Sequence, residues 1–270
     1  MKLKRNSFDT FKKDHKVFIE GHRGVNREFI QNSINSFKRG IEYGLDSMEF
    51  DVWLTKDKIP VILHGGDDGQ LFSYMKGIED KKELINNYTL EQLQKFDLVG
   101  KEVAKIPTLN EVLDLCKDKI FLNIEIKDFN IKECFELVVK MLEEKKMLNQ
   151  IALSSFNHGY YDFVSKYNNE HEEKIEFGFL YYDKREQYHF KDYDFNNAGN
   201  TMNVYQRDLT KEMVEMAHKN NIPVLVWFGM KDEESNELYQ KLFDMGIDVI
   251  CCNEPHKAKE FRDNVYNKKK

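Results

Sequence analysis

FLNIEIKDFNIKECFELVVKMLEEKKMLNQIALSSF, residues 121–156, is the stretch that decides the fold class of this chain. Its two ends, 121–126 and 151–156, are short apolar runs of the length that is typical of buried strands. Between them, residues 131–146 carry apolar side chains at helical spacing. Two strands joined through a helix lie parallel in a sheet, because the helix returns the chain to the end of the sheet at which the first strand began. The stretch therefore predicts one strand–helix–strand unit of an α/β protein.

The same alternation of strand and helix extends from this unit in both directions. Predicted strands cover residues 17–21, 47–55, 121–126, 151–156, 175–182, 201–205, 223–228 and 249–253. Predicted helices cover residues 31–43, 108–116, 131–146, 158–167, 209–220 and 233–245, followed by a charged C-terminal helix. Eight strands joined by helical crossovers favour an α/β fold of the (β/α)8 TIM barrel type. An open, doubly wound sheet is the alternative that this pattern leaves.

A further apolar run, PVILHG at 60–65, does not fit the alternation. Only KDKI separates it from the preceding strand, which suits a β-hairpin and not a helical crossover. With a turn centred between Lys56 and Asp57, the hairpin would set Glu49 opposite His64. The hairpin therefore predicts an imidazole and a carboxylate on one side of one sheet.

Residues 67–106 form the longest interruption of the alternation and include a helical pattern at 89–96. We expect a small insertion, or cap, packed over one end of the barrel. Because no linker rich in Pro, Gly or Ser divides the chain, we expect a single barrel domain over residues 1–270.

The composition indicates an ordinary globular protein, with 41% hydrophobic and 33% charged residues. A net charge of -6 gives no general attraction to nucleic acid, so we expect no nucleic-acid partner. No apolar run reaches the roughly 20 residues of a transmembrane helix, and the charged N-terminus lacks the apolar core of a signal peptide. The four cysteines show no metal-binding spacing, which indicates core packing in a reducing compartment. We expect a cytoplasmic protein.

Polar side chains gather where three predicted strands end. They are His22 and Arg23 after the first strand, Glu49 and Asp51 on the second, and Glu125 and Lys127 on the strand at 121–126. Residues two apart on a strand share a face, and barrel enzymes carry their chemistry at these carboxyl ends. Three converging carboxylates indicate a hard cation such as Mg²⁺ or Ca²⁺, which prefers oxygen ligands. A purely structural salt-bridge network with the two cations is the alternative.

Two imidazoles near these carboxylates point to phosphoryl chemistry. His22 and His64 can divide general-base and general-acid duties, since the pKa of histidine lies near neutrality. Arg23 can bind a phosphate oxygen bidentately, and Lys127 can act as a point charge. The sequence contains neither a GxxxxGK[ST] nor a GxSxG motif, which argues against a P-loop NTPase and an α/β-hydrolase.

Taken in order along the chain, these motifs resemble those of the glycerophosphodiester phosphodiesterase family. The resemblance is carried by HRG at 22–24, EFDVWLTKDKIPVILH at 49–64, IPTLNEVL at 106–113, EIK at 125–127, VW at 226–227 and GIDVICCNEP at 246–255. It therefore runs through nearly the whole chain, and the ordered set is more specific than any single piece.

The resemblance implies a TIM barrel that hydrolyses a small glycerophosphodiester to sn-glycerol 3-phosphate and an alcohol. A cyclic phosphate formed by the neighbouring glycerol hydroxyl is the intermediate that it suggests. The implied roles are metal ligands for Glu49, Asp51 and Glu125, an acid–base pair for His22 and His64, phosphate contacts for Arg23 and Lys127, and an apolar wall for Trp227.

Three positions depart from the family pattern. Gly65 stands where an Asp normally follows the second histidine, Gln31 replaces a Glu, and WFGM at 227–230 replaces WTVN. None of these changes removes an implied metal ligand or imidazole, so we expect activity. They leave the substrate open, and lysophospholipase D-like cleavage of lysolipid headgroups is one alternative. A non-catalytic phosphodiester-binding barrel is the other.

Overall fold

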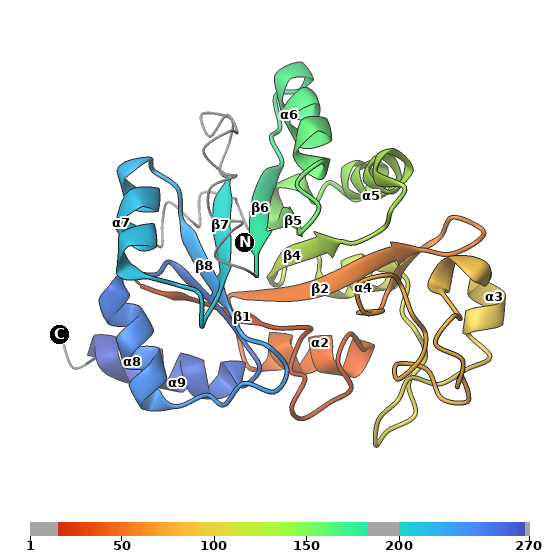
Figure 1. Ribbon diagram of the computed structural model, residues 1–270, viewed down its shortest axis with the longest axis horizontal. Coiled ribbons are helices and arrows are strands. Elements are labelled where there is room, and N and C mark those ends of the chain that lie inside the picture. Colours follow the sequence, from red (N-terminus) through yellow and green to blue (C-terminus); the bar gives the residue numbers. More distant parts are fainter. Residues whose placement is uncertain (1–15, 183–199, 268–270) are drawn as a thin grey trace.

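The computed structural model describes residues 16–182 and 200–267, and these residues form a closed barrel (Figure 1). Its eight parallel strands are β1 (Phe18–Gly21), β2 (Ser47–Leu54), β4 (Phe121–Ile126), β5 (Ile151–Ser155), β6 (Glu176–Tyr181), β7 (Thr201–Tyr205), β8 (Val224–Trp227) and β9 (Val249–Cys252). They pair in this order, and β1 pairs with both β2 and β9. The (β/α)8 prediction is confirmed, and this closure excludes the open sheet.

Helices surround the barrel, as Figure 1 shows. They are α2 (Ile34–Glu42), α4 (Leu109–Cys116), α5 (Ile131–Lys145), α6 (Tyr160–Glu170), α7 (Lys211–Lys219), α8 (Asn236–Met245) and α9 (Pro255–Asn267), with a 3-10 turn η2 (Leu148–Gln150) before β5. Within the described residues, no helix is long and apolar enough to cross a membrane. Residues 1–15, 183–199 and 268–270 lie outside the described residues.

Strand side chains alternate between two environments. One set, which includes Ile19 and Ile124, packs beneath the helices in the main hydrophobic core. The other set faces the barrel interior, where Phe18 and Leu225 form a separate small cluster. This alternation sends every second side chain of β2 and β4 toward the barrel axis.

A hydrogen-bonded polar layer crosses the barrel interior. Glu20 accepts hydrogen bonds from Ser47 Oγ and from Asn123 Nδ2, and Ser154 Oγ donates to Asn123 Oδ1 at 2.8 Å. These four side chains are buried, so their polar groups are satisfied mainly by one another. Asn123 and Ser154 also line the pocket at the carboxyl end of the barrel, so this layer forms the floor of that pocket.

The hairpin after β2 has a different register from the predicted one. β3 (Pro60–Ile62) runs antiparallel to β2, with Val52 opposite Ile62, so continuing the register places position 65, and not His64, opposite Glu49. The turn has three residues, 56–58, because Thr55 N bonds to Ile59 O, and Lys58 takes a left-handed φ of 64°. The predicted pairing of Glu49 with His64 is therefore wrong by one residue.

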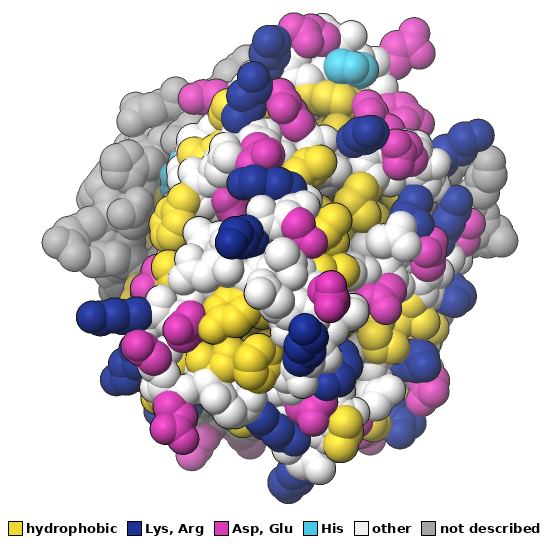
Figure 2. Space-filling view, turned by 90° about the vertical axis from the view of Figure 1, so that its right-hand side faces the viewer, with side chains coloured by type: hydrophobic (Ala, Val, Ile, Leu, Met, Phe, Trp, Pro, Cys, Tyr) yellow, Lys and Arg dark blue, Asp and Glu magenta, His cyan; other side chains and the backbone are white. Residues whose placement is uncertain are grey.

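Residues 67–106 pack beside this hairpin, at the right of Figure 1. The predicted helix at 89–96 is only one turn, α3 (Leu90–Leu93), preceded by the 3-10 turn η1 (Ile85–Asn87). The segment has its own apolar cluster, which includes Leu71, Met75, Ile85, Leu93 and Leu98, together with Trp53 and Leu63 from the hairpin. On the face in Figure 2, acidic and basic side chains are interspersed, with hydrophobic patches between them.

Candidate active site

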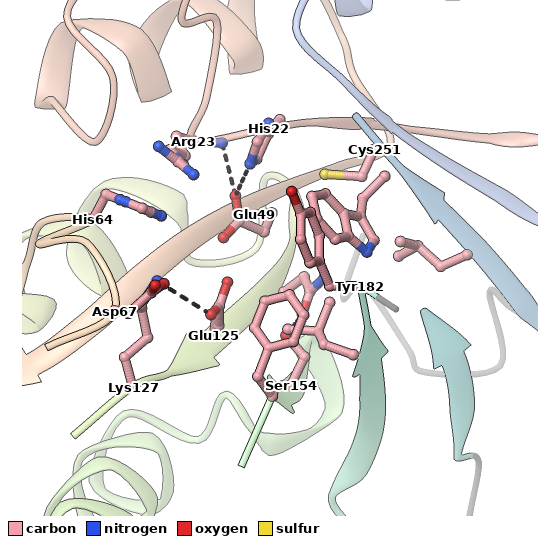
Figure 3. Close-up of a pocket in the computed structure, with 15 residues that line it drawn as sticks. His22, Arg23, Glu49, His64, Asp67, Glu125, Lys127, Ser154, Tyr182 and Cys251 are labelled. Carbon is pink, nitrogen blue, oxygen red and sulfur yellow. Dashed lines mark hydrogen bonds and ion pairs between the residues drawn. The ribbon is translucent and has the colours of Figure 1, made fainter. Parts of the chain in front are cut away.

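A pocket of about 430 Å³ opens at the carboxyl end of the barrel (Figure 3). Predicted site residues that line it are His22, Arg23, Glu49, His64, Glu125, Lys127 and Trp227. Asp51, the remaining predicted residue, is fully buried, with ion-pair contacts to Arg23 and Lys127. The structure therefore brings all eight predicted residues to one place, although they come from segments that are far apart in the sequence.

Three carboxylates form the acidic centre of the site. Glu49, Asp51 and Glu125 each offer an oxygen, and these oxygens lie within 4.8 Å of one another. All three side chains are buried, because they project from β2 and β4 toward the barrel axis. Mutual repulsion in a buried site requires cations to compensate the charges.

Two cations of the described chain lie in contact with this centre. Lys127 Nζ is 3.5 Å from both Asp51 Oδ1 and Glu125 Oε1, and Arg23 Nε is 3.5 Å from Asp51 Oδ2. The salt-bridge network considered from the sequence is therefore present. It sets two permanent positive charges against three carboxylates, which leaves one negative charge uncompensated if all three are ionised.

The donor set fits a hard divalent cation. Among the described residues, the buried oxygens Glu49 Oε1 and Asp51 Oδ1 have no hydrogen-bond partner. Burial raises the pKa of Glu49 well above its usual value, and the neighbouring Asp51 and Glu125 raise it further. Burial likewise raises the pKa of Glu125 to about 7, although Lys127 opposes the shift. Buried carboxylates are costly to ionise on their own. Their ionisation becomes favourable once a cation binds and neutralises their charge.

Asp51 is held in its ionised form by its neighbours. Burial raises the pKa of its carboxyl, but the positive charge of Lys127 and the other nearby cationic groups outweigh burial and hold the pKa below the usual value. Asn32 Nδ2 also donates to Asp51 Oδ2 at 2.8 Å. Asn32 directly follows Gln31, and the sequence had assigned it no role.

Arg23 is fixed from both sides. It adopts a left-handed φ of 55°, and its backbone N–H donates to Glu49 Oε2 at 2.8 Å. Its guanidinium donates to Gln31 Oε1 at 2.6 Å. The Gln at position 31 is therefore a neutral partner for Arg23, so more of the guanidinium charge is available to an anion than a Glu would leave.

The ring of His22 is held by Asn253. His22 Nδ1 lies 3.1 Å from Asn253 Oδ1, while Asn253 Nδ2 donates to Gly229 O at 3.0 Å. Because the amide nitrogen of Asn253 is engaged elsewhere, its oxygen faces His22, and we infer that Nδ1 carries the proton. Burial, followed by the charge of Arg23, lowers the pKa of His22 to about 3. Nε2, which lies 4.0 Å from Glu49 Oε2, is thus a free acceptor inside the site.

His64 comes from the loop after β3 and not from the strand itself. Its Nδ1 lies 2.7 Å from the Tyr74 hydroxyl and 3.2 Å from Gly66 N, which donates to it. In Figure 3 its ring points toward Arg23 and Glu49. Burial lowers the pKa of His64 well below its usual value, against the opposing charge of Asp51.

The other half of the pocket is apolar. It is lined by Phe156, Leu180, Tyr182, Leu225, Trp227 and Cys251, which lie on or just after β5, β6, β8 and β9. Tyr182 stacks on Trp227 with ring centroids 5.8 Å apart, and Phe156 meets Trp227 edge-on at the same distance. The pocket therefore places an apolar wall opposite a strongly polar one, as Tyr182 and Glu49 show in Figure 3.

Some site residues were not predicted from the sequence. Asn253 directly follows the last strand, so the rule that selects strand ends would have included it. Phe156 and Tyr182 follow β5 and β6 in the same way. Tyr74 lies in the 67–106 segment, and the sequence carries no signal that places it beside His64.

Comparisons with known proteins find relatives that match nearly the whole chain. A sequence model described as "Glycerophosphoryl diester phosphodiesterase family" matches residues 22–257. A protein of Caldanaerobacter subterraneus named glycerophosphodiester phosphodiesterase is 29% identical over 249 residues, covering 89% of this chain and 95% of that protein. A protein of Bacillus altitudinis with the same name is 25% identical over 256 residues, covering 92% and 98%.

Solved structures share the fold. A phosphodiesterase of Oleispira antarctica, solved in complex with its product sn-glycerol-3-phosphate, has a TM-score of 0.75 at 22% identity and covers 93% of this chain and 98% of its own. A glycerophosphoryl diester phosphodiesterase of Parabacteroides distasonis has a TM-score of 0.77 at 21% identity, covering 98% and 93%. At these identities the structural likeness establishes the barrel.

Proposed function

This chain belongs to the glycerophosphoryl diester phosphodiesterase family, and from that premise we propose that it hydrolyses small glycerophosphodiesters to sn-glycerol 3-phosphate and an alcohol. The observation that carries the proposal is the buried cluster of Glu49, Asp51 and Glu125 beside two imidazoles. The relatives named above bear the same activity in their names, and the Oleispira enzyme was solved with this product.

We propose that the three carboxylates hold Mg²⁺ or Ca²⁺. When bound, such a cation polarises a phosphoryl oxygen and offsets the charge that develops in the transition state. Arg23 and Lys127 would contact the phosphate oxygens, since both cations line the pocket next to the carboxylates. Gln31 supports this role for Arg23 because it orients the guanidinium without neutralising it.

We propose that His22 is the general base and His64 the general acid. With Nδ1–H directed at Asn253, His22 presents a lone pair at Nε2, which can take the proton of an attacking hydroxyl. His64 approaches from the other side of Glu49 and would give a proton to the departing alkoxide. Attack by the neighbouring glycerol hydroxyl would leave a cyclic phosphate, which water then opens, so the products are the phosphomonoester and the alcohol.

The apolar wall around Trp227 would contact the part of the substrate that carries no charge. A second candidate function has support here, because Phe156 is 45% and Tyr182 is 62% exposed at the pocket. Large exposed aromatic side chains beside a phosphodiester site suit an acylated substrate. Lysophospholipase D-like cleavage of a lysolipid headgroup is therefore the alternative that the experiment below must separate.

We propose that residues 1–270 act as one domain, in which residues 67–106 cap one side of the mouth. The apolar cluster that joins this segment to the hairpin supports a fixed cap. We also propose a cytoplasmic location, which the four buried free thiols favour.

The reaction is tested by incubating the full chain and Mg²⁺ or Ca²⁺ with glycerophosphocholine and, separately, with its acylated counterpart. We expect sn-glycerol 3-phosphate and choline from the water-soluble diester, quantified by enzymatic coupling. In His22→Ala the rate should fall by about a hundredfold or more, because a general base contributes that much.

Faster turnover of the acylated substrate would favour the lysophospholipase D alternative. Binding of either diester without turnover, under every divalent metal tried, would instead indicate a non-catalytic barrel. Full activity of the His22→Ala protein would refute the assignment of the base.

A further inference from the structure

We propose that Tyr74 is a positioning residue for His64, and that it supports the proton-donating form of that imidazole. This inference rests on the proposed function, because it concerns the acid of the same reaction. The supporting observation is the distance of 2.7 Å between the Tyr74 hydroxyl and His64 Nδ1. Tyr74 belongs to the 67–106 segment.

The two partners of Nδ1 differ in what they can do. Gly66 N lies 3.2 Å from Nδ1 and can only donate, so it can form a hydrogen bond with Nδ1 only when the ring is neutral. The Tyr74 hydroxyl can donate to the neutral ring and can accept from Nδ1–H when the ring is protonated. Of these two groups, only Tyr74 keeps a hydrogen bond to His64 throughout a cycle of proton transfer.

The same contact sets the direction of the ring. With Nδ1 tied to Tyr74 and Gly66, Nε2 is the nitrogen left to face the pocket that His64 lines. The rings of His64 and Tyr74 lie with centroids 5.5 Å apart and tilted by 47°, so Tyr74 also limits rotation of the imidazole. A proton on Nε2 is therefore aimed at the site.

Tyr74 is itself held firmly. Its backbone N–H donates to Leu71 O at 3.1 Å, and its carbonyl accepts from Val99 N at 2.8 Å. Its ring packs partly buried against the apolar cluster of residues 67–106 and the hairpin. The cap segment thereby gains a function, which is to fix an imidazole that emerges from a loop.

The local sequence explains why a tyrosine is needed here. Gly65 has a φ of 64°, and a Cβ at this position would lie 3.0 Å from both Trp53 Nε1 and Gly69 Cα. The Asp that usually follows the second histidine in the family would therefore be strained in this turn. Tyr74 supplies a polar partner for His64 from a different part of the chain.

The experiment compares Tyr74→Phe with the unmodified chain on two substrates. Glycerophosphocholine releases an alkoxide that needs a proton, whereas glycerol 3-phosphate 4-nitrophenyl ester releases a stable phenolate. We expect kcat on the choline ester to fall by about tenfold or more, with KM little changed, because general acid catalysis is impaired. On the nitrophenyl ester we expect a loss below about threefold, since the leaving group departs unaided.

Tyr88→Phe is the matched control. The Tyr88 hydroxyl bonds to Glu83 within the same segment, at 2.9 Å, and does not contact His64. We expect this variant to retain the rates of the unmodified chain on both substrates. A second measurement places Tyr74→Phe in a His64→Ala background, where it should cause no further loss on the choline ester.

Equal losses on the two substrates, or none on either, would overturn the role of Tyr74. So would an undiminished loss in the His64→Ala background. Turnover by the unmodified chain reads out the proposed function separately, so a chain that is active but indifferent to Tyr74→Phe refutes only this inference.

Discussion

Of the three site carboxylates, only Glu49 lacks an ion pair with Arg23 or Lys127, whereas Asp51 pairs with both and Glu125 with Lys127. Glu49 Oε2 accepts a hydrogen bond from Arg23 N at 2.8 Å, while its Oε1 has no partner among the described residues. In Glu49→Gln the amide oxygen can still accept from Arg23, but the negative charge is lost. We expect weaker Mg²⁺ or Ca²⁺ binding and a fall in kcat/KM of about a hundredfold or more, because metal catalysis is worth several kcal/mol. Calorimetric titration and turnover measure the two effects.

Glu20→Gln is the control for this substitution. Glu20 is also a buried carboxylate of the barrel interior, but it belongs to the polar layer below the site. Burial raises its pKa, and its partners Ser47 and Asn123 can also form hydrogen bonds to an amide. Metal affinity should stay within about twofold of that of the unmodified chain, as expected for sites without shared ligands. An equal loss of affinity in both variants would mean that Glu49 is not a ligand.

At the residue scale, the sequence predicted side chains that project from strands and missed those that support them. Glu49, Asp51 and Glu125 could be predicted from the sequence, because strand alternation assigns each side chain to a face of the sheet. Asn253 and Tyr74 contact the two histidines. The contact of Asn253 with His22 joins segments that are remote in sequence, and strand alternation cannot place them side by side. Tyr74 and His64 are only ten positions apart, yet irregular turns between them leave no period from which to infer contact.

The turn after β3 is the element that delivers His64. Gly65 and Gly66 both have positive φ, but only a Cβ at Gly65 would meet close neighbours, whereas at Gly66 the nearest atom is 3.8 Å away. We expect Gly65→Ala to lower the free energy of unfolding by roughly 2 to 4 kcal/mol, through left-handed strain and overpacking together. Gly66→Ala should cost about 1 kcal/mol, from the strain alone.

Denaturant unfolding of the two variants measures this difference. Gly65→Ala should also slow turnover, because relief of the contact with Trp53 requires the loop that carries His64 to move. Equal stability losses in the two variants would show that the turn has room at Gly65 and that its glycine is not required by packing.

Other elements show where pattern reading fails. The hairpin was correctly expected, but its register depends on one residue, Lys58, which adopts a left-handed conformation and gives a three-residue turn. Nothing in KDKI distinguishes that turn from a shorter one. The helix predicted at 89–96 shrinks to α3 because its apolar residues pack into a small cluster of irregular chain, where no long amphipathic face is needed.

For the whole molecule, the alternation of strands and helices predicted the barrel, because each helical crossover brings the next strand parallel to the one before it. Closure is visible only in the structure, where β1 pairs with β9 and α9 packs beneath. Arg262 from α9 bonds to Val17 O at 3.1 Å and pairs with Asp46, which joins the last helix to the first strand. The closed barrel then gathers the strand ends into one mouth, and the chemistry proposed above depends on that convergence.

If this mouth catalyses a metal-dependent hydrolysis, as proposed above, removal of the metal should stop the reaction. The rate of sn-glycerol 3-phosphate release from glycerophosphocholine is measured after treatment with EDTA and again after Mg²⁺ or Ca²⁺ is restored. We predict a loss of about a hundredfold or more on chelation and full recovery with the cation. A rate that is unchanged in excess EDTA would contradict the proposed metal-dependent mechanism, because the reaction would then not need a cation bound to the three carboxylates.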